Sequence, residues 1–258
     1  MEIAAKSSQI QSESPALPLT EKAAALVQQI QADPENASLY QQLGLALRTQ
    51  LRFRDAIQAY SVGLTYAPFC KELYRHRGHA YLNLRRYSEG AADFEMALRL
   101  DPEYWDALYH QGLCFYLMGQ YERAKKTLTR CIAVSKDDGS LISATDWYCL
   151  SLMQLGQIDE MKQAAARIRP DMIPGSGEGY FERCLAYNGT ISLEEALRIA
   201  ESRDDHMYAT GAYGLGVYYQ RVLGDSATAK AIWEKILTKD TTWAGFAEHA
   251  THESLKTV

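Results

Sequence analysis

Residues 74–102 read YRHRGHAYLNLRRYSEGAADFEMALRLDP, and their landmarks recur along the chain every 34 residues. Glycines lie at this spacing, and so do prolines and large apolar residues. Self-similarity at a fixed period is typical of a repeat architecture, so these columns predict repeated units. The columns are Gly44, Gly78, Gly112; Pro34, Pro68, Pro102; Leu47, Tyr81, Phe115; Phe53, Tyr87, Tyr121; and Tyr60, Phe94, Leu128.

Each unit has the pattern of a helix hairpin. Tyr40, Leu43 and Leu47 are spaced three and four residues apart, which places them on one helix face. Glycine in a helix interior costs about 1 kcal/mol relative to alanine, so we expect it only where a second helix approaches closely. Asp101-Pro102 ends the second helix, because proline lacks the N–H group and disfavours helix in its predecessor. The central glycines are therefore predicted to mark helix crossings.

At these positions the chain resembles the tetratricopeptide repeat (TPR) family, whose unit is a helix hairpin of 34 residues. The resemblance implies an all-α fold, a right-handed α-α superhelix (solenoid) of tetratricopeptide-type helix hairpins with terminal capping helices. It also implies a non-catalytic protein-protein interaction scaffold that binds a peptide or helix of a partner protein in the concave groove. No cofactor is expected.

The domain organisation follows from where the repeat is clear and where it weakens. We expect residues 1–18, rich in Ser, Gln and Pro, to be a disordered leader. Thr241 and Thr242 are suited to cap the last helix. The remaining boundaries are 19–36 for an N-terminal capping helix, 37–138 for three clear repeats, 139–242 for two to three degenerate repeats, and 243–258 for a C-terminal capping helix and tail.

The stretch PGSGEGY at 174–180 has alternating glycines, as phosphate loops do. A dinucleotide fingerprint needs a preceding strand, and the residues before this stretch are predicted to be helical. We therefore interpret it as a linker between the fourth and fifth units. Gly177 is expected to tolerate alanine.

Charge and cysteine content narrow the class of protein. The net charge of the 258 residues is −5, but residues 48–86 hold eight basic and two acidic side chains, which indicates an acidic partner. No apolar run has the length of a membrane helix or a secretory signal, so a cytoplasmic protein without membrane contact is expected. Five cysteines without a CxxC pair are typical of reduced structural thiols.

The histidine-rich and arginine-rich stretch at 74–81 divides into two sets. Tyr74, Gly78 and Tyr81 occupy structural positions of the repeat, and Arg77 is predicted to form a salt bridge with Asp93. The resemblance places the other residues in the concave groove, where Tyr, Trp and Arg are frequent anchors. The complete candidate groove is Gln41, Arg48, Arg75, His76, His79, Tyr109, His110, Tyr116 and Trp147.

This groove is expected to bind a protein or peptide that carries Asp or Glu followed by a large apolar residue. Binding is expected to strengthen from pH 8 to 6, through protonation of His76 and His79. A carboxylate clamp of the kind that binds chaperone tails is not expected. Its positions in the family correspond here to Gln41, Leu45, His76, Asp106 and His110.

Other interpretations of the sequence remain open. A metal-binding solenoid could use His76, His79 and His110, or His249 and His252, although a full ligand set is not evident. Nucleic-acid binding through the basic second repeat is disfavoured, because its tyrosines have structural duties and the whole chain is acidic. No nucleophile–base set indicates an enzyme. The groove could also be a solvated face with incidental aromatic residues.

Overall fold

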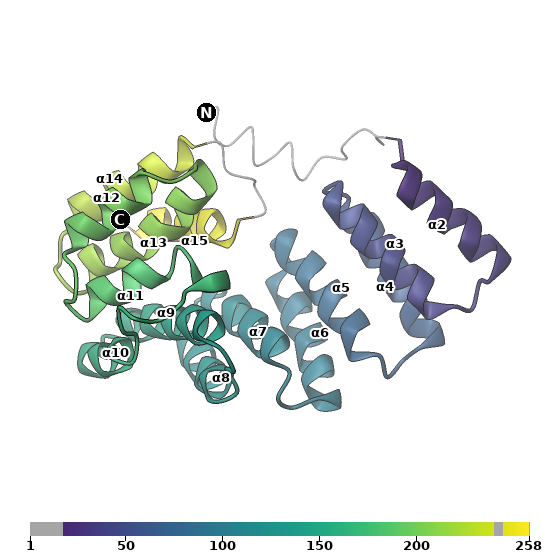
Figure 1. Cartoon of the computed structure of the whole chain (residues 1–258), viewed down its shortest axis with the longest axis horizontal. Coiled ribbons are helices and arrows are strands. Elements are labelled where there is room, and N and C mark those ends of the chain that lie inside the picture. Colours follow the sequence, from purple (N-terminus) through teal and green to yellow (C-terminus); the bar gives the residue numbers. More distant parts are fainter. Residues whose placement is uncertain (1–17, 240–244, 258) are drawn as a thin grey trace.

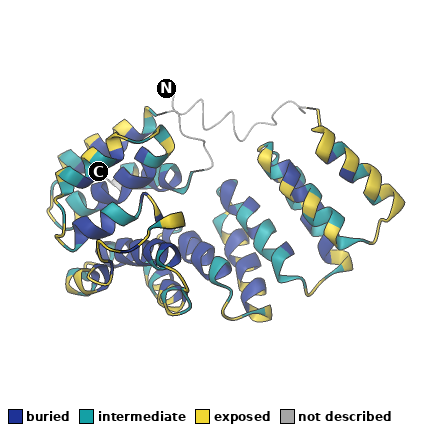
Figure 2. Ribbon diagram, in the orientation of Figure 1, coloured by how far each residue is buried: buried dark blue, intermediate teal, exposed yellow. Residues whose placement is uncertain are grey.

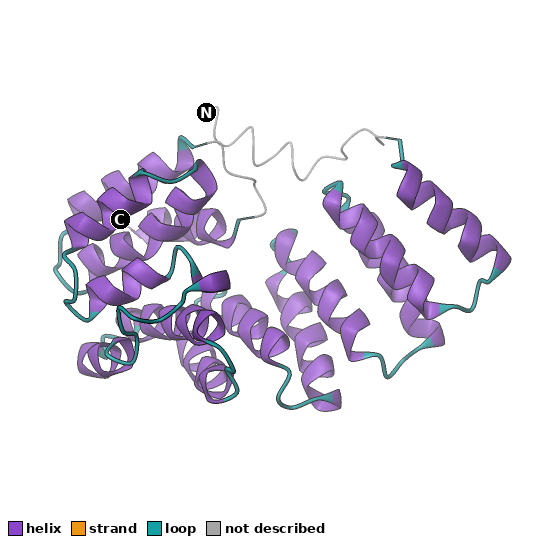
Figure 3. Cartoon of the chain, in the orientation of Figure 1, coloured by secondary structure: helices purple, strands orange, loops and turns teal. Residues whose placement is uncertain are grey.

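The computed structural model describes residues 18–239 and 245–257, and the regular elements within these ranges are all helical (Figure 3). The predicted all-α solenoid is confirmed. Apart from Pro18, the predicted leader lies outside the described residues. The helices are α2 (Glu21–Ala32), α3 (Ala37–Thr49), α4 (Phe53–Tyr66), α5 (Lys71–Asn83), α6 (Tyr87–Leu100), α7 (Trp105–Leu117), α8 (Tyr121–Ala133), α9 (Asp138–Gln154), α10 (Ile158–Ala165), α11 (Phe181–Tyr187), α12 (Leu193–Glu201), α13 (Asp205–Arg221), α14 (Ser226–Leu237) and α15 (Phe246–Ser254), with 3-10 turns η1 (Gly175–Gly177) and η2 (Leu255–Thr257).

Consecutive helices pair as α3–α4, α5–α6 and α7–α8, and the pairs follow one another along a curve (Figure 1). The predicted crossings at the central glycines are confirmed, since each glycine faces a large side chain of the second helix. A Cβ atom would come within 3.0 Å of Phe94 at Gly78 and 2.7 Å of Leu128 at Gly112, and would clash with the Tyr60 ring at Gly44.

The turn between the two helices of a hairpin uses a left-handed residue. This residue is Leu51 (φ 58°) and Arg85 (φ 59°) in the first two hairpins, and Gly119 (φ 70°) and Gly156 (φ 72°) in the next two. In each turn the amide of the following residue donates to the carbonyl five residues earlier, as in a Schellman motif. The first two hairpins thus hold L-residues where glycine is favoured.

Helix α9 is the most enclosed helix of the C-terminal half, and nearly all its residues are buried (Figure 2). Helices α8, α10, α11 and α13 pack around it. Its N-terminus is closed by a capping box, in which Asp137 accepts from the Ser140 amide at 2.8 Å and the Asp137 amide donates back to the Ser140 hydroxyl at 3.3 Å. A helix buried on every side belongs to a core rather than to an open surface.

The glycine-rich stretch at 174–180 connects α10 to α11, but it is packed more tightly than a free linker. Its turn η1 lies against the start of α9, and Gly177 is buried. A Cβ atom on Gly177 would come within 2.8 Å of the Gly139 carbonyl oxygen and 3.0 Å of Ile142. The expectation that Gly177 tolerates alanine is therefore wrong, because the Gly139 backbone and the Ile142 side chain leave no room for a methyl group.

The C-terminal helices fold back onto the repeats. Helix α13 contacts α9, and α15 contacts α13, α14 and α7. Figure 1 shows α13 and α15 next to each other at the end of the curve. Helix α15 begins at Phe246 after Gly245, while the predicted caps Thr241 and Thr242 lie outside the described residues.

The cysteines are unpaired, and most of them are buried. All five cysteines are free, and Cys114, Cys131, Cys149 and Cys184 are buried. Burial raises the pKa of each of these four thiols. Among the described helices, none combines the length and the apolar composition needed to cross a membrane.

Candidate peptide-binding face

Arg48 is the charged centre of the face formed by α3 and α5. Its Nη2 donates to Nδ1 of His79 at 2.7 Å. Its Nε is buried beside the buried hydroxyl of Tyr60, in a contact whose geometry falls outside that of a regular hydrogen bond. Burial lowers the pKa of Arg48, and the nearby Arg75 adds to this effect, although arginine remains charged at any physiological pH. The guanidinium group of Arg48 on this face is therefore not paired with a carboxylate.

The neighbouring arginines are fully paired. Arg75 binds both carboxylate oxygens of Asp106, at 2.8 and 2.5 Å. Arg77 binds both oxygens of Asp93, at 2.7 Å each, so the predicted Arg77–Asp93 salt bridge is confirmed. Such bidentate pairs already satisfy the guanidinium donors. Of these three arginines, only Arg48 has no acidic partner.

The two histidines beside Arg48 are held neutral. Burial, together with the nearby charges of Arg75 and Arg48, lowers the pKa of His76 to about 4. Burial, with His110 and Arg48 nearby, also lowers the pKa of His79 well below its usual range. Neither imidazole gains a proton between pH 8 and 6. In place of the strengthening predicted from the sequence, we therefore expect acidic-ligand binding to stay flat over that range.

The remaining groove candidates are not on an open surface. Tyr109, His110, Tyr116 and Trp147 are all buried, and Trp147 is only 1% exposed. The expectation that they line an open groove needs correction, because later parts of the chain cover them. No side chain of this group is free to anchor a ligand in this conformation.

The covering residues come from far along the chain. The hydroxyl of Tyr109 donates to that of Tyr180 at 3.3 Å and accepts from the Trp147 indole at 3.0 Å. The hydroxyl of Tyr116 lies 2.8 Å from that of Tyr213 on α13. These partners are 71 and 97 residues away in sequence, so the repeat pattern gives no signal of them.

Phe246 of α15 lies at the edge of the region where later helices cover the repeats. Its ring centroid lies 5.6 Å from that of His79 and 5.9 Å from that of His110, with tilted and edge-on geometry. Such aromatic contacts are attractive. The candidates on the uncovered side of this helix are Gln41, Arg48, Arg75 and His76, each partly exposed.

Sequence reasoning missed a buried ion pair under α11. Asp146 is fully buried, and its carboxylate accepts from Nε and Nη2 of Arg183, with the Nε–Oδ1 distance at 2.9 Å. Nη1 of Arg183 donates to the Thr210 carbonyl at 2.8 Å. The one signal in the sequence is Arg183 directly before the apolar run at 184–187 of α11.

The histidines suggested as metal ligands in the second and third repeats contact other side chains. His76 stacks on Tyr60, and Nδ1 of His110 lies 2.7 Å from Oδ1 of Asp106. Across residues 18–239 and 245–257, no three His, Cys, Asp or Glu side chains converge as a metal ion would need. The structure thus adds no support to a metal site at the second repeat.

Two family models described as "Tetratricopeptide repeat" match the chain, at residues 72–104 and 106–135. These ranges coincide with the hairpins α5–α6 and α7–α8. The chain contains tetratricopeptide repeats. Solved structures of this fold extend the likeness over the remaining helices, although their low identity supports the fold alone. One from Parabacteroides merdae has a TM-score of 0.61 at 16% identity, covering 97% of this chain and 98% of its own.

Curated relatives of this TPR protein are distant and longer. RNA polymerase II-associated protein 3 of Homo sapiens is 22% identical over 203 residues, which are 78% of this chain and 29% of the relative. The Hsp70-Hsp90 organizing protein of Triticum aestivum is 28% identical over 102 residues, 40% of this chain and 18% of the relative. The chain therefore spans less than a third of either protein.

Proposed function

We propose that this TPR protein is a non-catalytic scaffold that binds an acidic segment of a partner protein on the face formed by α3 and α5. The observation that carries the proposal is the guanidinium of Arg48, which is partly buried and has no carboxylate partner. A carboxylate supplied by a ligand would pair with this guanidinium in a charge-assisted hydrogen bond.

The charges around Arg48 favour an anion. Arg48 and Arg75 face the single carboxylate of Asp106, and His76 and His79 are neutral at pH 7, so the group carries a net charge of +1. Attraction of an acidic segment to this group would be weakened by salt, because exposed charges are screened over roughly 8 Å at physiological ionic strength. The site therefore selects for negative charge.

An apolar contact lies beside this charge. Leu45 precedes Arg48 by three residues on α3, so the two side chains share a helix face, and Leu45 is 37% exposed. A large apolar residue next to the ligand's Asp or Glu would cover Leu45, and Gln41 lies one turn further along. The sequence-based ligand chemistry is kept, but its apolar anchor moves from the buried Trp147 to Leu45.

The comparisons are consistent with a binding role. The solved structure of YrrB is described as a TPR protein with an unusual peptide-binding site; its TM-score is 0.53 at 19% identity, covering 91% of this chain and 99% of its own. The names of the two curated relatives, RNA polymerase II-associated protein 3 and Hsp70-Hsp90 organizing protein, both refer to association with other proteins. The clamp positions of the family hold Gln41, Leu45, His76, Asp106 and His110 here, so we do not propose chaperone tails as the ligand.

A peptide array tests this proposal. Twelve-residue peptides that pair Asp or Glu with a neighbouring Leu or Phe are screened, and the best binder is measured by calorimetry. Arg48→Gln should weaken it at least 10-fold, which corresponds to about 1.4 kcal/mol. Because both histidines are neutral, the affinity of the wild type should stay flat between pH 8 and 6.

Arg54→Gln is the matched control, since it removes the same charge from the exposed part of α4. It should leave the affinity unchanged. Equal affinities of wild type and Arg48→Gln, with melting temperatures also equal, would reject this face as the binding surface. A rise in affinity between pH 8 and 6 would show that a histidine contacts the ligand.

A further inference from the structure

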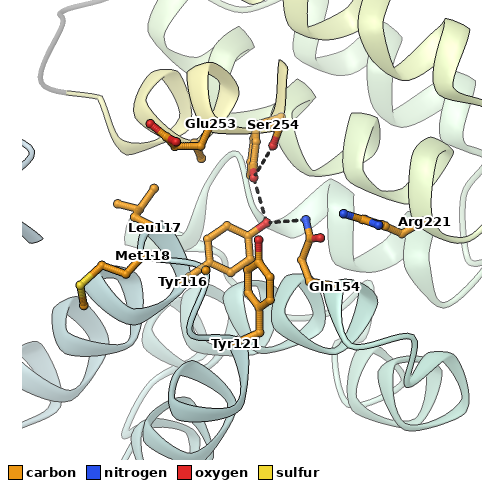
Figure 4. Close-up of a pocket in the computed structure, with 11 residues that line it drawn as sticks. Tyr116, Leu117, Met118, Tyr121, Gln154, Arg221, Glu253 and Ser254 are labelled. Carbon is orange, nitrogen blue, oxygen red and sulfur yellow. Dashed lines mark hydrogen bonds between the residues drawn. The ribbon is translucent and has the colours of Figure 1, made fainter. Parts of the chain in front are cut away.

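A pocket lies where the C-terminal helices meet the repeats. Its volume is about 260 Å³. One wall comes from the end of α7, the start of α8 and the end of α9, and the other from α13 and α15 (Figure 4). This pocket is separate from the face around Arg48.

A chain of polar groups crosses the pocket. Tyr116 accepts from Nε2 of Gln154 at 3.4 Å, its hydroxyl lies 2.8 Å from that of Tyr213, and Tyr213 lies 3.3 Å from the Ser254 hydroxyl. The side-chain oxygen of Gln154 is buried and has no partner. Buried polar groups are nearly always paired, so an unpaired amide oxygen at a pocket wall calls for a donor.

Two groups at the pocket are available to an anion. Arg221, the last residue of α13, extends toward Gln154 in Figure 4, and it makes no ion pair or hydrogen bond with the described residues. The hydroxyl of Tyr121 points into the same space. The carboxylate of Glu253 at the rim is held by Lys256 at 2.8 and 2.7 Å, so it does not neutralise Arg221.

The remaining lining sets the size and polarity of an occupant. Leu117, Met118 and Ala250 add an apolar patch beside the polar chain. Pockets for drug-sized ligands run from about 300 Å³ upward, so this pocket suits a smaller molecule or a single residue. The occupant needs an acid group, a nearby N–H or O–H donor and a short apolar body.

We propose that this pocket binds an α-substituted carboxylate, with the carboxylate on Arg221 and the Tyr121 hydroxyl and an adjacent N–H or O–H group directed to the Gln154 oxygen. The carboxylate belongs to a free acylated or hydroxylated amino-acid-like molecule or to the C-terminal residue of a peptide. Since the walls come from both the repeats and the C-terminal helices, binding stabilises the docked position of α15.

Calorimetry with N-acetyl-leucine, N-acetyl-phenylalanine and their carboxamides tests the proposal on the full chain. The acids should bind in a saturable way and at least 10-fold more tightly than the amides. They should also slow amide exchange in α15. Failure of both acids to saturate the protein at 10 mM ligand would overturn the proposal. A dissociation constant of 10 mM corresponds to a binding free energy of roughly −2.7 kcal/mol. Equal binding of acids and amides would also overturn it.

Variants locate the site, and a peptide identifies the source of the carboxylate. Arg221→Gln should weaken acid binding at least 10-fold and Tyr121→Phe severalfold, while Lys230→Gln on the exposed side of α14 should change nothing. Arg221→Gln within twofold of wild type would overturn the proposal. Acetyl-Ala-Ala-Leu binding 10-fold more tightly than N-acetyl-leucine assigns the pocket to a peptide C-terminus, whereas equal or weaker binding assigns it to a free small molecule. Both assignments fall within the proposal.

Discussion

Leu51 and Arg85 hold a backbone conformation that the next two turns leave to glycine. Their φ values are 58° and 59°, against 70° at Gly119 and 72° at Gly156. A left-handed conformation costs an L-residue about 1–2 kcal/mol, because its Cβ approaches the following carbonyl oxygen. The first two hairpins therefore carry strain that the later ones avoid.

Replacing Leu51→Gly should relieve this strain. Leu51 is 47% exposed, so the substitution removes little buried apolar area. We expect the free energy of unfolding to rise by about 0.5–1 kcal/mol, after part of the gain is lost to the greater freedom of glycine in the unfolded chain. Chemical denaturation measures this difference.

Gly119→Ala is the converse control. Nothing lies within 4 Å of a Cβ atom at Gly119, so any loss of stability there reports the backbone conformation and not a clash. We expect a loss of about 1 kcal/mol. A destabilised Leu51→Gly protein would mean that the leucine side chain contributes more than its strain removes.

At the scale of elements, α9 divides the molecule into two kinds of packing. Before it, the hairpins contact mainly their neighbours in sequence, as expected of a solenoid, with α15 as the later helix that reaches α7. At α9, helices α11 and α13 add contacts from later in the chain, and the Asp146–Arg183 pair lies in that added layer. This added layer therefore contains a charge pair that is buried from water.

Asp146→Ala should destabilise the protein strongly. It leaves Arg183 buried with the Thr210 carbonyl as its remaining hydrogen-bond acceptor among the described residues, and removing one member of a buried pair costs about 3–5 kcal/mol. Glu201→Ala is the control, because the Lys235–Glu201 pair is largely exposed and such pairs contribute about 0–1 kcal/mol. Thermal denaturation of both variants checks the contrast, and equal losses would contradict it.

At the scale of the whole molecule, the chain closes on itself. Helix α15 reaches back to α7, and Phe246 contacts His79 of the second repeat. The inner face of the repeats is therefore divided into a covered part around Trp147 and a partly exposed part around Arg48. The available binding surface is smaller than the repeat count implies.

Phe246→Ala should loosen this closure. Loss of the ring removes its contacts with His79 and His110, so amide exchange should become faster in α15 while α3 and α4 keep their protection. Hydrogen exchange with mass spectrometry measures both regions. Leu223→Ala, at a side chain that is 53% exposed, should leave exchange in α15 unchanged. Unaltered exchange in the Phe246→Ala protein would show that the remaining contacts of α15 with α13, α14 and α7 hold the helix.

The sequence by itself determined the repeat, the hairpins and the residues that hold them. Gly44, Gly78 and Gly112 could be predicted because repetition at 34 residues aligns local contacts. The Arg77–Asp93 pair could be predicted because the second repeat resembles a variant of the family that carries both residues. The basic character of the second repeat was also readable, since charge is a property of composition.

Only the tertiary structure decided which parts of the inner face are covered. Tyr116 meets Tyr213 across 97 residues, and Trp147 is buried by helices that no period relates to it. The same holds for Gly177, whose small size is required by the Gly139 backbone. Contacts between distant segments arise from the path of the chain in space. Arg48 stands out for this reason: the sequence shows one of many arginines, and the fold alone leaves its guanidinium without a carboxylate.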